Sequence, residues 1–585
     1  MNRRQFIKTV GAAAVSLSMP HRSYAGPSNK KPNVILVMTD DQGYGDLRCH
    51  GNTAIETPNL DRLYNQSVRL TNFHVSPTCS PTRAALMTGR YCNRTGVWHT
   101  IMGRSLLRKD ELTMADVFAA NGYRTAIFGK WHLGDNYPYR PQDRGFQEVL
   151  IHSAGGIGQG ADYWGNDYFD DTYRRNGRAE KFRGYCTDVW FAEAIKFIEA
   201  NRNRPFFCYL PTNAAHGPFR VPDSYSRLYK DRGLESPAAE FYGMITNIDD
   251  NMGRLMRRLD ELGLSDNTIL IFMTDNGSTM GRRHGLFNAG MRDNKGSEYD
   301  GGHRVPCFIR WPAGRIKAPR DIGRITAHID LLPTLIDLCG LGAFDSVRFD
   351  GRSLVPLLTG DARNWPDRII ITDSQRVDHP VKWRKSAVMT DRWRLVNARQ
   401  LYDIQSDPGQ QVDIAAKHPE LVEKLRRAYE KWWQDVSERF DEYCHIVIGS
   451  DKADPVLLTS HDIHGQVVWN HEQVRKGKRA DGFWAVEIAR DGEYELALRR
   501  WPVELDRPIT AAENDRGTGA KLHATHARLK VGCIDITRPV DKDASQVKFR
   551  VRLQAGKTRL QGWFINAFDN GGVFGAYYVL ARRLS

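Results

Sequence analysis

The chain reads NVILVMTDD from Asn33 to Asp41, a continuous apolar run that ends in two carboxylates. Such a run is typical of a central strand in a sheet that is covered on both faces. A second run, residues 268–274, has the same character and ends in Asp275 and Asn276. Polar residues at the carboxyl ends of buried strands predict an open α/β sheet with its site at that edge.

The residues that follow the two strands carry hard oxygen ligands of the kind that Ca²⁺ and Mg²⁺ prefer. If the strands are neighbours, four side chains converge on one divalent cation: Asp40, Asp41, Asp275 and Asn276. The alternative is a helix cap or a turn, which suits one aspartate better than two in tandem. The sequence therefore predicts one cation site at this edge of the sheet.

A helix is predicted to begin at Cys79, where residues 79–90 read CSPTRAALMTGR. Pro81 fits a first helical turn because its missing N–H costs nothing there. The unpaired backbone N–H groups of a helix start favour negative charge. Arg83 lies one turn beyond Cys79, close enough to share a ligand with it. The alternative is a buried, inert cysteine beside a surface arginine.

Four further polar residues lie at strand ends or in loops. They are Lys130 and His132 in the segment 122–134, which is predicted as a helix C-cap, a strand and then a loop, His216 after the run 205–210, and Lys295 in the segment 294–306. At an extended strand end Lys130 and His132 would point the same way. Taken alone, a lysine and a histidine here would be surface residues.

Three strings together resemble the signatures of the type I sulfatases, the formylglycine-dependent, arylsulfatase-like members of the alkaline phosphatase superfamily. They are C-x-P-x-R followed by LMTGR in residues 79–90, GYRTAIFGKWHLG in residues 122–134, and K-x-x-x-x-D-G-G-x-R-x-P in residues 295–306. The departure is Asp300, where the family commonly has Glu; we expect this change to leave Lys295 in place. The resemblance covers roughly residues 32–440.

The resemblance implies an α/β fold, an alkaline-phosphatase-like sandwich with a large mixed sheet flanked by helices and a small α+β subdomain. It also implies that a formylglycine-generating or anaerobic maturation enzyme oxidises Cys79 to formylglycine, whose hydrate is the nucleophile. The implied ligands of one divalent cation, Ca²⁺ in the family, are Asp40, Asp41, residue 79, Asp275 and Asn276.

The remaining roles also come from the resemblance. Arg83, Lys130 and Lys295 would hold the sulfate oxygens in a preorganised positive site. His216, helped by Lys295, would donate a proton to the leaving oxygen. His132 would take a proton from the second hydroxyl of the hydrate and so regenerate the aldehyde.

Composition and charge agree with an anionic substrate. The net charge of the 585 residues is +14, and removing the four cations of the predicted leader leaves +10. A basic surface suits a sulfated small molecule or polymer as well as nucleic acid. Because no zinc-finger, RNA-recognition or basic-zipper pattern is present, no nucleic-acid partner is expected. The nine cysteines are scattered without CxxC spacing, which indicates neither a zinc site nor a disulfide framework.

The first 25 residues predict a signal peptide of the twin-arginine type. Arg3 and Arg4 precede a short apolar run, and Ala25 closes a small-residue cleavage site. An ordinary signal peptide with a chance Arg-Arg pair is the alternative. Either predicts an exported bacterial protein, periplasmic or secreted. Since no later segment is apolar enough to span a bilayer, no integral membrane association is expected.

We predict three domains after the leader. They are a catalytic domain at 32–360, a C-terminal subdomain at 361–440 closed by a helix over 419–436, and an accessory antiparallel β-sandwich at 445–585. The β-sandwich would bind glycans, with Trp469, Trp501 and Trp563 as candidates, or pack on the catalytic domain. The glycine-rich, aromatic loop 155–173 also has two alternative roles. Its aromatic side chains would stack on a sugar, or they would only anchor a surface loop.

The sequence thus predicts a sulfuric ester hydrolase that releases inorganic sulfate from O-sulfated substrates, favouring carbohydrates. One alternative is a phosphomonoesterase or phosphonate monoester hydrolase on the same scaffold. A catalytically silent glycan-binding protein is the other, and it requires Cys79 to remain a thiol.

Overall fold

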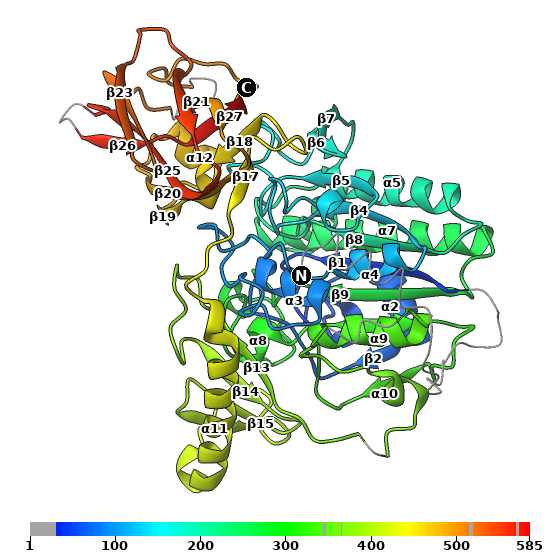
Figure 1. Ribbon diagram of the computed structural model, residues 1–585. Helices are drawn as coiled ribbons and strands as arrows, with labels where there is room; N and C mark the ends of the chain where they lie inside the picture. Colours follow the sequence, from blue (N-terminus) through cyan, green and yellow to red (C-terminus); the bar gives the residue numbers. More distant parts are fainter. Residues whose placement is uncertain (1–30, 343–346, 364, 514–518, 569–571) are drawn as a thin grey trace, which may run out of the picture.

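The computed structural model describes residues 31–342, 347–363, 365–513, 519–568 and 572–585. The predicted leader, residues 1–25, lies outside the described residues. Figure 1 shows a large layered body, a smaller sheet with one long helix below it, and a body of β-strands above it. Within the described ranges, none of the helices has the length and apolarity that a membrane span needs.

A ten-stranded mixed sheet forms the centre of the large body, in the order β11-β2-β10-β9-β1-β8-β4-β5-β6-β7. The two apolar runs of the sequence are β1 and β9, and they pair in parallel as predicted neighbours. The strands are β1 Asn33–Thr39, β2 Val68–Leu70, β4 Arg124–Lys130, β5 Glu148–His152, β6 Thr172–Arg175, β7 Arg178–Lys181, β8 Phe206–Pro211, β9 Thr268–Thr274, β10 Cys307–Arg310 and β11 Arg320–Ile322.

Helices cover both faces of this sheet, as the continuous apolar run of β1 predicts. Leu36 packs in a core with Leu86 of α3, whereas its neighbour Val37 packs in a second core with Trp190 of α5 and Ile245 of α7. The alternation follows from the two-residue period of a strand. The helices are α2 Pro58–Gln66, α3 Cys79–Thr88, α4 Met114–Ala120, α5 Cys186–Ala200, α6 Asp223–Lys230, α7 Ala238–Glu261, α8 Asp300–His303, α9 Leu331–Cys339 and α10 Val355–Thr359.

A four-stranded antiparallel sheet and helix α11 form the smaller unit. Helix α11, Pro419–Val436, packs Leu425 and Tyr429 against Val388 and Leu395 of the sheet, so the predicted closing helix is confirmed. The strands are β13 Ile370–Asp373, β14 Ser386–Met389, β15 Trp393–Val396 and β16 Gln400–Asp403. A two-stranded sheet of β3 Phe73–His74 and β12 Thr326–Ala327 adjoins this unit, since Ala327 shares a core with Ile370 and Ala387.

Two further sheets of seven and four strands form the C-terminal body, and most of their pairs are antiparallel, as predicted. Trp484 of β20 and Leu496 of β21 belong to the core between them. The elements are β17 Ile446–Ile448, β18 Val456–Thr459, β19 His464–Gln466, α12 His471–Arg475, β20 Asp481–Ile488, β21 Gly492–Arg499, β22 His526–Val531, β23 Ile534–Pro539, β24 Val547–Leu553, β25 Gly556–Ile565, β26 Val573–Gly575 and β27 Tyr578–Arg583.

The C-terminal body shares its core with the large body. Leu106 and Tyr139 pack in the same apolar cluster as the C-terminal sheets, and the Tyr139 hydroxyl donates to the carbonyl of His445 at 2.8 Å. Trp164, from the aromatic loop, meets Trp501 edge to face with ring centroids 5.4 Å apart. Trp501 is fully buried, which excludes it as a glycan contact and leaves the packing alternative for this residue. Trp164 therefore acts as a packing residue of this interface.

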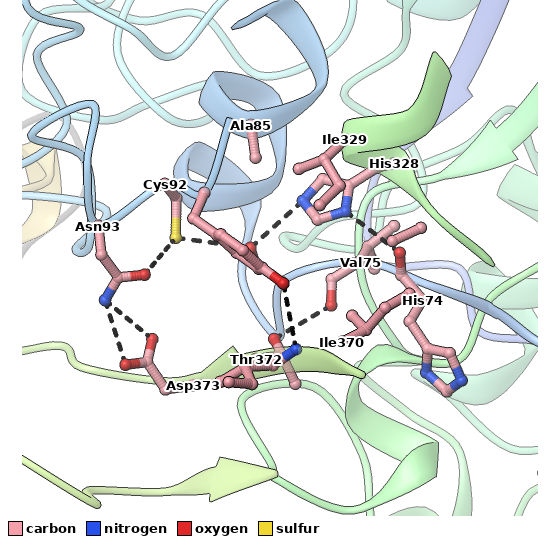
Figure 2. Close-up of a pocket in the computed structure, with 14 residues that line it drawn as sticks. His74, Val75, Ala85, Cys92, Asn93, His328, Ile329, Ile370, Thr372 and Asp373 are labelled. Atoms are coloured by element: carbon pink, nitrogen blue, oxygen red, sulfur yellow. Dashed lines mark hydrogen bonds between the residues drawn. The ribbon is translucent and has the colours of Figure 1, made fainter. Parts of the chain in front are cut away.

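The nine cysteines are all free thiols. Cys92 lines a cavity of about 10 Å³ behind helix α3, shown in Figure 2, and its thiol donates to the side-chain oxygen of Asn93 at 3.2 Å. A cavity of this size is at the lower limit for one water molecule. It is a packing defect rather than a ligand site.

Candidate active site

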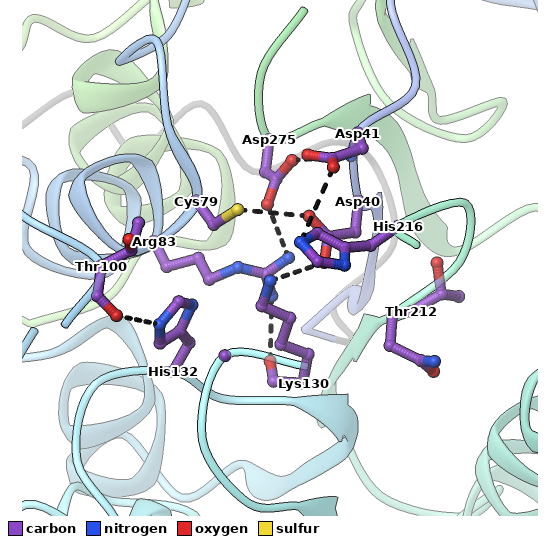
Figure 3. A network of polar contacts seen from close by, with 12 residues as sticks. Asp40, Asp41, Cys79, Arg83, Thr100, Lys130, His132, Thr212, His216 and Asp275 are labelled. Carbon is purple, nitrogen blue, oxygen red and sulfur yellow. Dashed lines mark hydrogen bonds and ion pairs between the residues drawn. The ribbon is translucent and has the colours of Figure 1, made fainter. Parts of the chain in front are cut away.

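The polar residues that follow β1 and β9 meet at one edge of the sheet. Thr39 and Thr274 are register partners at the ends of the two strands, so the residues after them lie side by side. The backbone N–H of Asp41 donates to Asp275 Oδ1 at 3.2 Å. Asp40, Asp41 and Asp275 are all buried, and Figure 3 shows their carboxylates turned toward one another.

Helix α3 brings Cys79 to the same place. Its Sγ lies 3.4 Å from Asp40 Oδ1, and one ligand atom from each of Asp40, Asp41, Cys79 and Asp275 lies within 4.8 Å of the others. Asn276 adds a carbonyl oxygen, Oδ1, that is buried and has no hydrogen-bond partner among the described residues. Leaving such an oxygen unpaired costs about 1–3 kcal/mol. The donor set and this orphaned oxygen fit a hard divalent cation.

Each of the three carboxylates is paired with a different cation. Lys130 Nζ lies 2.5 Å from Asp40 Oδ2, and Lys295 Nζ lies 2.5 Å from Asp41 Oδ1. Arg83 donates to Asp275 Oδ2 at 2.8 Å and to the carbonyl of Lys130 at 3.0 Å. By formal charge the cluster is neutral, and a bound divalent cation would make it a positive site for an anion.

Burial and charge set the protonation states in the cluster. Burial alone would raise the pKa of Asp41, but Lys295 and His216 hold it well below its usual range. Burial, with a contribution from Asp40, raises the pKa of the Cys79 thiol to about 12. As encoded, residue 79 is therefore a protonated thiol.

His132 lies two residues beyond the end of β4, in a left-handed conformation with φ of 59°. The prediction that Lys130 and His132 share one extended strand end is therefore wrong, because the chain turns after Lys130. The ring Nε2 donates to the carbonyl of Thr100 at 2.8 Å, whereas Nδ1 is buried without a partner among the described residues. Burial, with the nearby Lys130 charge, holds the pKa of His132 well below its usual range. A neutral ring with a free Nδ1 can accept a proton.

His216 approaches the cluster from the loop after β8. Its Nδ1 donates to the carbonyl of Gly217 at 2.6 Å, which leaves Nε2 unprotonated, 3.8 Å from Asp41 Oδ2. Burial lowers the pKa of His216 to about 4, so the ring is neutral near pH 7 in the ligand-free protein.

The departure at Asp300 leaves Lys295 beside Asp41. Asp300 instead accepts a hydrogen bond from Arg394 Nε at 2.8 Å, which ties helix α8 to strand β15 of the smaller unit. His74 and His303 come close enough to Asp300 to form a second possible metal group. Their ring nitrogens are, however, hydrogen-bonded to each other, to Asn72 and to the carbonyl of Glu298. We therefore assign this cluster a structural role and not metal binding.

The structure brings all the candidate residues into one place, including Arg83, Lys130, His132, His216 and Lys295. Sequence reasoning missed Thr100, whose carbonyl orients the His132 ring. A backbone carbonyl carries no side-chain signature, so no sequence signal could have identified it.

Gly129 fixes the backbone that presents Lys130. Its φ is 127°, and a Cβ placed there would lie 1.9 Å from the carbonyl oxygen of Pro211. We expect Gly129→Ala to lower the free energy of unfolding by at least about 3 kcal/mol. Gly122→Ala is the matched control, since Gly122 has a φ of 82° but open space around it. It should lose only about 1 kcal/mol. Equal losses in chemical denaturation would contradict the steric argument.

Two family models match this chain. A sulfatase model covers residues 32–341, and a model described as N-sulphoglucosamine sulphohydrolase, C-terminal, covers residues 284–435. With the mixed sheet and the buried site at its edge, these matches define a hydrolase of the alkaline phosphatase superfamily. The chain belongs to the sulfatase family and is an enzyme of that family.

Its relatives include arylsulfatase A of Homo sapiens, 33% identical over 367 residues, which span 57% of this chain and 69% of that protein. N-acetylgalactosamine-6-O-sulfatase of Bacteroides thetaiotaomicron is 29% identical, over 69% of this chain and 94% of that protein.

Among solved structures, Ps i-CgsB in complex with k-i-k-neocarrahexaose has a TM-score of 0.64 and 28% identity, and the match covers 71% of this chain and 95% of that one. A phosphonate monoester hydrolase of Agrobacterium radiobacter has a TM-score of 0.52 at 21% identity, over 70% of this chain and 97% of that one. The second likeness shows the fold alone.

Proposed function

We propose that this sulfatase releases inorganic sulfate from O-sulfated carbohydrates and that its nucleophile is a formylglycine made from Cys79. The observation that carries the proposal is the position of Cys79, at the start of α3 and within 4.8 Å of three carboxylates that are themselves paired with cations. A maturation enzyme of the formylglycine-generating or anaerobic type would carry out the oxidation. The hydrated aldehyde would supply the attacking hydroxyl.

One divalent cation, for which we propose Ca²⁺, would be held by Asp40, Asp41, residue 79, Asp275 and Asn276. It would polarise the sulfate ester and stabilise a deprotonated oxygen at residue 79. Lys130 and Lys295 project their ammonium groups into the same space and can donate to the non-bridging sulfate oxygens. Arg83, whose terminal nitrogens are engaged by Asp275 and Lys130, positions those two groups.

The two histidines are suited to proton transfer. His132 has a free, buried Nδ1 that can accept a proton from the second hydroxyl of the hydrate. His216 presents Nε2 at the Asp41 side of the cluster, where a protonated ring could donate a proton to the leaving oxygen of the ester. Because the ring is neutral in the ligand-free protein, we infer that it takes up its proton only with the anionic substrate bound.

The carbohydrate preference rests on the basic charge of the chain and on the names of its relatives, which include an N-acetylgalactosamine-6-O-sulfatase. The leader of the twin-arginine type that the sequence predicts would direct the protein to the periplasm or beyond. These points support a substrate that the cell meets outside the cytoplasm.

The test is a panel of sulfated mono- and disaccharides, 4-nitrophenyl sulfate and 4-nitrophenyl phosphate. We expect sulfate release from at least one saccharide and from the aryl sulfate, with the phosphate ester at least about 100-fold slower, because the chain belongs to the sulfatase family. Ion chromatography of sulfate and phosphate measures the rates. Faster phosphate release would favour the phosphomonoesterase alternative, and activity on the aryl sulfate alone would remove the carbohydrate assignment.

A further inference from the structure

A segment of the C-terminal body closes one side of the candidate active site. It runs from the end of β18 through the short 3₁₀ helix η7, Ser460–Asp462, to the start of α12. The backbone N–H of Met102 donates to the carbonyl of His461 at 2.9 Å, and that of Gly160 donates to the carbonyl of Trp469 at 2.8 Å. The backbone N–H of His471 donates in return to the carbonyl of Gly158 at 3.0 Å. The segment is thus hydrogen-bonded to two loops of the large body.

Both of those loops touch His132. One supplies the Thr100 carbonyl that accepts from the ring, at 2.8 Å. In the other, a Cβ added to Gly155 would lie 2.3 Å from the ring, so the Gly155 backbone packs directly on His132. A further residue of that loop, Gln159, pairs with Asn470 in an isolated β-bridge. The C-terminal segment therefore reaches the immediate surroundings of His132.

His461 is the side chain that this segment delivers there. Its ring centroid lies 6.0 Å from that of His132, and the residue is only 2% exposed. His461 Nδ1 lies 3.4 Å from Asp462 Oδ1, which leaves Nε2 as the acceptor nitrogen. Neither His461 Nε2 nor His132 Nδ1 has a hydrogen-bond partner among the described residues.

Unpartnered nitrogens in two neighbouring histidine rings are unusual in a core, because each buried polar atom without a partner costs free energy. A hydroxyl has one proton to donate, so a hydroxyl of the substrate could satisfy the His461 Nε2 acceptor and leave His132 Nδ1 free to accept the proton of the hydrate. Sugars present hydroxyls beside a sulfate ester, whereas a simple aryl sulfate does not. An acceptor at His461 Nε2 would therefore favour a sulfated sugar over a simple aryl sulfate.

We propose that His461 is a substrate-binding residue that the C-terminal body contributes to the active site, where its Nε2 accepts a hydrogen bond from a hydroxyl of the sugar carrying the sulfate. The inference rests on the carbohydrate substrate proposed above. Both family models end before it, at residues 341 and 435, so neither match accounts for His461. The C-terminal body then determines specificity rather than only binding or packing.

His471 provides a matched control. It lies in the same segment, is also buried and also has an unpartnered Nε2, but it stacks on Trp164, with ring centroids 4.3 Å apart, instead of facing His132. Replacing either histidine by phenylalanine keeps a ring in place and removes the nitrogens. The pair of variants therefore separates the loss of a buried nitrogen at this interface from the loss of a substrate contact.

The experiment compares His461→Phe, His461→Gln and His471→Phe with the wild type on 4-nitrophenyl sulfate and on a sulfated disaccharide that the wild type cleaves. We expect His461→Phe to raise KM for the disaccharide about tenfold, the value of one hydrogen bond, with aryl-sulfate kcat/KM within about twofold. His461→Gln, which restores an acceptor, should recover part of that loss. His471→Phe should leave kcat/KM unchanged for both substrates.

The outcomes are distinguishable. An equal loss of kcat/KM on both substrates would show that His461 has a structural role. An unchanged KM for the disaccharide would show that His461 does not contact the sugar. Either result overturns the inference while the sulfatase function stands. If the wild type releases sulfate from the aryl ester but from no saccharide, the carbohydrate assignment fails together with this inference. Thermal unfolding of each variant checks that the fold is kept.

Discussion

Replacing Cys79 by alanine is expected to lower sulfate release by about 10⁴-fold or more, because the change removes the only precursor of the nucleophile and one of the cation ligands. The fold should survive. The Cys79 side chain is buried, and among the described residues its thiol donates one hydrogen bond, the 3.4 Å contact with Asp40. Removing one sulfur atom from such a place costs about 1–2 kcal/mol. Thermal unfolding should therefore shift by only a few degrees.

Cys92→Ala is the matched control for this prediction. Cys92 is buried as well, and its thiol contacts Ser76 and Asn93 beside the small cavity behind α3. Its loss should cost similar stability and leave turnover intact. Mass spectrometry of the peptide that contains residue 79 tests the chemistry directly. An intact thiol in fully active protein would refute the formylglycine mechanism, and activity in Cys79→Ala would refute the assignment of residue 79.

Much of the site could be predicted because its residues lie next to strong local patterns. The apolar runs of β1 and β9 identify buried strands, and the residues that follow such strands are fixed at the sheet edge. Asp40 and Asp275 were predicted to meet on this basis, and the structure brings them together. Helix α3 begins at Cys79, as its Pro81 and apolar spacing indicate.

Side-chain positions were harder to predict from the sequence where contacts between distant segments of the chain determine them. His132 turns out of the strand direction, because the chain after β4 adopts a left-handed conformation there. The choice between glycan binding and packing stayed open for Trp501, because its packing partner Trp164 lies more than 300 residues earlier in the chain. His461 had no visible role, because its neighbour His132 is also more than 300 residues away. Contacts of this kind leave no periodicity or motif.

The three ion pairs of the site raise a question that a single substitution cannot answer. Removing Asp275 takes away a proposed cation ligand, but it also leaves the buried Arg83 guanidinium without its carboxylate partner. Breaking a buried pair in this way costs about 3–5 kcal/mol of stability by itself. A loss of stability in Asp275→Asn is therefore no evidence for a metal.

Asp300→Asn separates the loss of a cation ligand from the loss of a buried ion pair. Asp300 and Arg394 form an ion pair that is 2.8 Å long and as deeply buried as the pair of Asp275 and Arg83, but it lies in the cluster to which we assign a structural role. We expect both variants to unfold at lower temperature. In the wild type and in Asp300→Asn, Ca²⁺ at 100 times its Kd should add about 2.7 kcal/mol relative to chelator, a shift of several degrees in Tm.

Asp275→Asn should lose that calcium-dependent shift and about 10³-fold or more of its sulfate release, since the variant lacks one carboxylate ligand and its cluster carries a net charge of +1, which repels a cation. Differential scanning calorimetry with Ca²⁺ and with chelator measures the shift without reference to turnover. If Asp275→Asn kept the full shift, the cation would have to bind elsewhere. If the wild type showed no shift with Ca²⁺ but did with Mg²⁺, the site would stand and the identity of the ion would change. The comparison thus separates the ligand role of Asp275 from its role as the partner of Arg83.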